Sequence, residues 1–100
     1  VVVKRNGERQ LFDREKLTKS ILTALRKRPV EQTRVAQLVS DLEQQFTESG
    51  RSEMTSREIG DAVLNVLKDV DFIGYVRYAS VYHDFKEPQD FAAFLAESEG

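Results

Sequence analysis

Two lysines near the beginning of the chain are the side chains best placed for chemistry. Lys4 precedes an Asn6-Gly7 dipeptide, and Lys16 falls in the first turn of an expected helix. The helix dipole disfavours a cation in a first turn, whereas the free N–H groups of that turn attract anions. The two lysines are therefore locally inconsistent unless an anion lies between them, which indicates a site for a small polyanion such as a phosphate group. The residues alone leave a second interpretation open, in which both lysines point into water.

The charge distribution favours a small polyanion over a nucleic acid. The formal net charge is −2, yet residues 1–28 hold nine Lys and Arg against three Asp and Glu, a balance of +6. The rest of the chain holds six basic and fourteen acidic residues, a balance of −8. General nucleic-acid binding rests on many phosphate contacts spread over a surface, which a mainly acidic domain does not offer. An ordinary, unevenly charged surface is the alternative.

Other kinds of chemistry find little support in the composition. The 100 residues contain no cysteine and a single histidine, His83, so neither a Cys/His dyad nor a multi-histidine metal site can form. The five glycines match neither the Walker nor the Rossmann phosphate-binding pattern. The sequence therefore predicts a binding domain, not an enzyme, with no metal ligands of its own.

A row of tyrosines could form part of the same site. Tyr75, Tyr78 and Tyr82 recur at intervals of three and four residues, so they share one face of an expected helix. Aromatic rings with polar ends suit a pocket for a nucleobase, but they suit a half-buried core position equally well. The core is the default interpretation.

A β-hairpin is expected to carry the first lysine. Asn-Gly between two short runs predicts a two-residue turn. This register places Val3 opposite Gln10 and Lys4 opposite Arg9. Like charges directly opposite one another are destabilising, which again indicates an anion nearby.

Helices are expected to make up most of the remaining chain. The first begins at an Asp13 cap, includes a basic last turn and stops before Pro29. A Thr55-to-Glu58 capping box begins the third, and Asp71 caps the fourth, with Phe72 and Ile73 turned inward. The expected helices span residues 13–28, 31–49, 55–70, 71–85 and 89–97, with a short strand at 53–54.

The fold class is α+β: one domain, residues 1–100, in which about four helices and a short C-terminal helix are capped by the hairpin and a short third strand. No segment is long and apolar enough to cross a membrane.

Several segments together resemble a known family. "VVVKRNGERQLFDREKL" is similar to the opening of the ATP-cone, the regulatory nucleotide-binding domain found in ribonucleotide reductases. "ALRKRPV", "YVRYASVYHDF" and "DFAAFL" are similar to the ATP-cone of the NrdR family, the bacterial transcriptional repressors of ribonucleotide reductase genes. The resemblance covers nearly the whole chain. It implies a cytoplasmic domain with four helices under a three-stranded sheet, which binds ATP and dATP as regulatory ligands.

The resemblance also implies a set of nucleotide-binding residues. In the family, a Lys-Arg pair and a downstream lysine contact phosphates, and a threonine and a tyrosine lie near the nucleotide. One position departs from the family pattern, because Gln10 stands where Glu is common. The corresponding residues here are Val3, Lys4, Arg5, Gln10, Lys16, Thr55 and Tyr82.

The implied mechanism is allosteric. Nucleotides change how the cones associate into oligomers, and a zinc ribbon upstream of the cone contacts promoter DNA. The abrupt start and missing cysteines lead us to expect that this ribbon precedes the present sequence. An ATP-cone that regulates a ribonucleotide reductase catalytic subunit is the alternative. A helical dimerisation module without a ligand would explain Phe91, Phe94 and Leu95 but leave the lysines unexplained.

Overall fold

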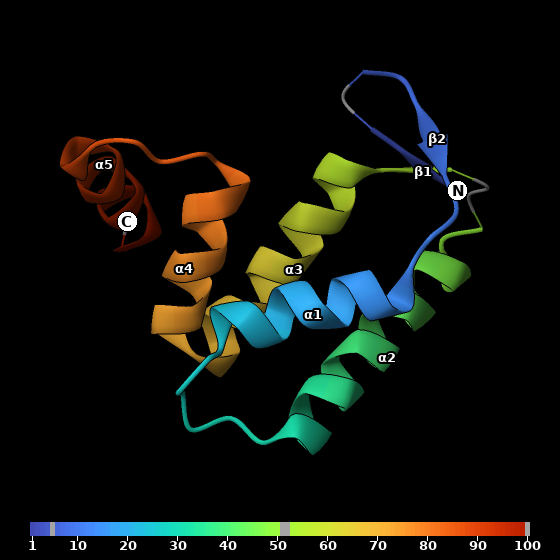
Figure 1. Ribbon diagram of the computed structural model, residues 1–100, viewed down its shortest axis with the longest axis horizontal. Coiled ribbons are helices and arrows are strands. Elements are labelled where there is room, and N and C mark those ends of the chain that lie inside the picture. The colour runs from blue at the N-terminus through green and yellow to red at the C-terminus, as the bar shows by residue number, and fades with distance from the viewer. Residues whose placement is uncertain (5, 51–52, 100) are drawn as a thin grey trace.

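Three short strands pair beside a group of helices in the computed structural model, which describes residues 1–4, 6–50 and 53–99 (Figure 1). The strands are β1 (Val2–Val3), β2 (Arg9–Gln10) and β3 (Met54–Thr55), in the order β2-β1-β3. β1 pairs antiparallel with β2 and parallel with β3. The parallel pair brings the start of the helix after β3 to the side of the hairpin.

Five helices account for most of the described residues. Each begins and ends within a few residues of its expected bounds, apart from the C-terminal end of the first. The helices are α1 (Arg14–Ala24), α2 (Gln32–Glu48), α3 (Ser56–Val70), α4 (Phe72–Tyr82) and α5 (Pro88–Glu99). The predicted α+β class is confirmed, and none of the described helices is long and apolar enough to cross a membrane.

The predicted hairpin register is wrong by one residue. Val2 pairs with Gln10, Val3 pairs with Arg9, and the Lys4 N–H donates to the Glu8 carbonyl at 2.8 Å. Gly7 has a φ of 87°, and its N–H donates to the Lys4 carbonyl at 2.9 Å. A glycine in the left-handed region at this place closes a three-residue loop instead of a two-residue one.

The new register removes the clash of like charges. Lys4 now lies opposite Glu8, not Arg9. Because side chains alternate across a strand, a shift of one residue carries Arg9 to the other face of the sheet from Lys4. There its guanidinium forms an exposed ion pair with Glu53, 2.9 Å away. Repulsion between Lys4 and Arg9 therefore supplies no argument for an anion.

The apolar core lies between the first four helices. α1 contributes Leu17 and Ile21, and α3 contributes Val63 and Leu67. α4 presents Tyr75 and Ala79 to this core, both less than a tenth exposed. The prediction that Phe72 and Ile73 turn inward is wrong, because they are 41% and 44% exposed. The buried face of α4 is instead the one that carries Gly74, Tyr75 and Ala79.

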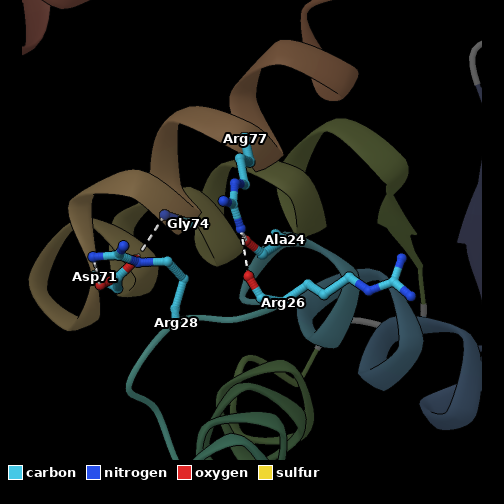
Figure 2. Close-up of polar contacts among 6 residues, drawn as sticks. All are labelled: Ala24, Arg26, Arg28, Asp71, Gly74 and Arg77. Atoms are coloured by element: carbon cyan, nitrogen blue, oxygen red, sulfur yellow. Dashed lines mark hydrogen bonds and ion pairs between the residues drawn. The ribbon is translucent and has the colours of Figure 1, made fainter.

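A polar junction joins the end of α1 to the start of α4 (Figure 2). The Asp71 carboxylate accepts two hydrogen bonds from Arg28, at 2.9 and 3.1 Å, and one from the Gly74 N–H at 2.9 Å. Arg77 donates to the carbonyls of Ala24 and Arg26, at 3.3 and 2.6 Å. The hydrogen bonds from Arg28, followed by that from Gly74, hold the pKa of Asp71 below its ordinary value.

This junction explains why the first helix is shorter than predicted. α1 ends at Ala24, and Lys27 has a φ of 61°, so the basic run 26–28 lies beyond the helix. Arg28 and the Arg26 carbonyl bind groups of α4 instead of extending the last turn. The junction thereby holds the end of α1 against α4.

The last helix packs on α4 through aromatic rings. The centroid of Phe94 lies 5.1 Å from that of Tyr75 and 5.4 Å from that of Phe85. Phe91 contacts Phe85 as well but remains 38% exposed. The C-terminal helix thus buries part of its apolar face within the chain and leaves part of it accessible.

Candidate functional site

A cavity of about 350 Å³ opens between the sheet and three helices. The sheet contributes Val2, Lys4 and Gln10, all on the same face. The first two turns of α1, the first turns of α3 and the second half of α4 form the other walls. Its volume falls within the range usual for small-molecule sites.

Three cations line this cavity, each from a different element. Lys4 follows β1, Lys16 lies in α1 and Arg57 lies in α3. Within the part of the chain that the structure describes, none of the three side chains forms an ion pair. Other arginines are paired; Arg14, for example, reaches Glu43 at 3.3 Å and Ser40 at 2.9 Å. The wall of the cavity therefore carries three positive charges that no described acidic side chain neutralises.

The acidic and capping groups near the cavity are already occupied. Asp13 also lines it, but its carboxylate accepts the Lys16 main-chain N–H at 3.1 Å and caps α1. The Thr55 hydroxyl accepts the Glu58 N–H at 3.0 Å, and the Glu58 carboxylate accepts the Thr55 N–H at 3.4 Å. The predicted capping box is confirmed, and it engages the side chain of Thr55.

Two tyrosines of α4 form the aromatic wall. The Tyr82 hydroxyl lies 2.9 Å from the Arg57 carbonyl and 3.2 Å from the Asp61 carboxylate, and its ring rests on Gly60 of α3. Tyr78 is half-buried, and burial raises the pKa of its phenol. A hydrogen bond with Ser20 opposes that rise. Tyr75, the third tyrosine of the row, belongs to the core.

The structure gathers part of the predicted residue set in one place. Lys4, Gln10, Lys16 and Tyr82 all line the cavity. Val3 is on the other face of β1 from Lys4, and Thr55 caps α3 just outside the lining. Arg5 lies outside the described residues.

Sequence reasoning assigned no role to Arg57 and Ser56, which also line the cavity. Their position directly after the capping threonine was visible in the sequence. The parallel pairing of β3 with β1, which brings that turn over the cavity, was not. Among the described residues, no group of three or more His, Asp or Glu side chains gathers in a way that could hold a metal ion.

Comparison with known proteins gives a consistent result. Residues 1–88 match the ATP cone domain. The chain is 55% identical over 98 residues to the transcriptional repressor NrdR of Hyphomonas neptunium, covering 98% of this chain and 62% of that protein. It is 51% identical over 96 residues to the repressor of the same name from Phenylobacterium zucineum, covering 96% and 62%. The chain thus spans less than two thirds of the length of these relatives.

Proposed function

Because the chain belongs to the ATP-cone domain family, we propose that it binds ATP and dATP as the regulatory domain of a transcriptional repressor of ribonucleotide reductase genes. The observation that carries this proposal is the cavity between the sheet, α1, α3 and α4, with Lys4 and Lys16 on its wall. The triphosphate lies between the hairpin and the start of α1, where these two ammonium groups neutralise it. The sugar and base lie toward Gln10 and the tyrosines of α4.

The repressor is favoured over a reductase subunit by the names of the relatives. Those reported above are transcriptional repressors, and they extend beyond the matched region. We assign promoter DNA and zinc to such a further segment of the whole protein. The present residues do not suit zinc, since they include no cysteine and a single histidine.

The proposed mechanism is a change of assembly without chemistry on the nucleotide. A ligand shifts an equilibrium between oligomers only by binding them with different affinities. ATP and dATP differ by one 2′-hydroxyl, so the site must sense that group. Exposed apolar side chains of α4 and α5, among them Phe72, Ile73 and Phe91, supply surface for contacts between copies.

Calorimetric titration of the protein with ATP and with dATP tests the binding step. We expect saturable binding of both nucleotides and no accumulation of ADP or inorganic phosphate during the experiment. Failure of both nucleotides to bind would contradict the proposal. Hydrolysis that disappears on substitution of a single cavity residue would contradict its non-enzymatic part.

A further inference from the structure

Arg57 is a cation of the cavity for which neither the motif resemblance nor the sequence pattern provides a role. It is the second residue of α3, its side chain is exposed, and it lines the same cavity as Lys4 and Lys16. Its guanidinium makes no hydrogen bond or ion pair with any residue in the described ranges 1–4, 6–50 and 53–99. Positive charges that share one cavity repel one another, and an anion that enters the cavity is attracted to all of them.

Tyr82 contacts the main chain of this arginine. Its hydroxyl lies 2.9 Å from the Arg57 carbonyl, which fixes the first turn of α3 against the end of α4. The Asp61 carboxylate, one turn further along α3, lies 3.2 Å from the same hydroxyl. Asp61 is the acid at helical spacing from Arg57, and this contact directs it toward Tyr82.

The cap of α3 already uses some of the main-chain donors at the start of this helix. Free N–H groups at a helix start can bind anions by themselves. In α3, the Thr55 hydroxyl and the Glu58 carboxylate already satisfy two of these donors. The Arg57 guanidinium adds charged donors on this side of the cavity, beyond the main-chain N–H groups that the cap leaves open.

We propose that Arg57 is a phosphate-binding residue of the cavity and that Tyr82 is its positioning residue. The inference rests on the proposed nucleotide site and adds a third cation from a third element. Cations on separate walls suit a chain of phosphates better than a single phosphate, because each can neutralise a different part of it. Tyr82 thereby influences nucleotide affinity through α3, in addition to any contact of its own ring.

Calorimetry with ATP on a matched set of variants tests this assignment. Arg57→Gln keeps most of the side-chain length but removes the charge, whereas Arg57→Lys keeps the charge. Arg14→Gln is the control, because Arg14 is paired with Glu43 and does not line the cavity. We expect Arg57→Gln to weaken ATP binding about tenfold or more, Arg57→Lys to restore much of the loss, and Arg14→Gln to change little.

A double substitution tests the role of Tyr82. Tyr82→Phe keeps the ring on Gly60 and removes the hydroxyl that holds Arg57 and Asp61. We expect Tyr82→Phe to weaken ATP binding in the unsubstituted protein and to have a much smaller effect when Arg57 is already Gln. Additive effects would contradict the positioning role.

The remaining outcomes separate this inference from the proposed function. Wild-type ATP affinity in Arg57→Gln would overturn the role of Arg57 and leave the nucleotide site standing. Equal losses in Arg57→Gln and Arg57→Lys would show that positive charge at this position does not carry the effect, and would overturn the assignment of Arg57 as a charge that neutralises phosphate. Absence of ATP binding by the unsubstituted protein would contradict the proposed function, and this inference with it.

Discussion

The substitution Gly60→Ala tests the contact between α3 and α4, because the added Cβ would overlap the Tyr82 ring. A Cβ atom at Gly60 would stand 2.7 Å from Cζ and 2.8 Å from Cδ1 of the Tyr82 ring. Because real Cβ atoms essentially never approach so closely, the ring must move away from α3. Its hydroxyl would then lose the Arg57 carbonyl and the Asp61 carboxylate.

Two opposing terms decide the stability of Gly60→Ala. Alanine gains about 1 kcal/mol over glycine inside a helix. Forcing the Tyr82 ring from its place costs roughly 1–3 kcal/mol, and loss of its hydrogen bonds costs about 1 kcal/mol more. We therefore expect Gly60→Ala to lower the free energy of unfolding by about 1–3 kcal/mol, as measured by urea denaturation.

The same substitution should have the opposite sign when the ring is absent. In a Tyr82→Ala background the ring atoms nearest to the new Cβ are gone, so Gly60→Ala should raise the free energy of unfolding by up to about 1 kcal/mol. Gly74→Ala, measured alone and in a Leu25→Ala background, is the matched comparison. A Cβ at Gly74 would overlap the Leu25 side chain, as a Cβ at Gly60 would overlap the Tyr82 ring. Stabilisation by Gly60→Ala in both backgrounds would refute the placement of Tyr82 on α3.

Three further predictions concern the cavity, the junction and the assembly. Lys4→Ala and Lys16→Ala should each weaken ATP binding by about 1–3 kcal/mol in calorimetry, with Arg14→Ala as the control, since lost charged hydrogen bonds cost this much. The lowered pKa of Asp71 stabilises the fold above the ordinary Asp pKa of about 3.9, and this stability is lost as pH falls below it. Asp71→Asn keeps an N-cap group but removes the charge. Urea denaturation should therefore show a lower free energy of unfolding at pH 7, and a smaller fall of that free energy between about pH 5 and pH 2, than in the unsubstituted protein. An equal fall in both proteins would contradict this. Light scattering should give different average masses with ATP and with dATP, and one unchanged mass in ATP, dATP and no ligand would contradict a switch within this domain.

Local signals made the helices predictable. Asp13, Thr55 with Glu58, and Asp71 cap helices through hydrogen bonds that span three residues, and all three caps are confirmed. Such bonds depend on little beyond the neighbouring sequence, so a reading of residue types finds them. The same holds for the end of α2, which was expected at residue 49 and is followed by Gly50 with a φ of 69°.

Non-local contacts account for what the sequence did not predict. Asn6-Gly7 is compatible with a two- or a three-residue loop, and the observed register also lets Arg9 reach Glu53 near β3. The length of α1 depends on an acceptor 43 residues away, since Arg28 binds Asp71. The place of Arg57 in the cavity depends on the parallel pairing of β3 with β1. None of these contacts has a signature in a short stretch of sequence.

Nuclear magnetic resonance with ATP is the most direct test of the nucleotide site. In a titration followed through main-chain amide signals, we expect the largest shifts at the cavity, at Lys4, Lys16 and Gly60. Signals of α2 residues that face away from the cavity, such as Gln37 and Gln44, should change little. Shifts concentrated on α2, or on the aromatic contact between α4 and α5, would contradict the site proposed for the nucleotide.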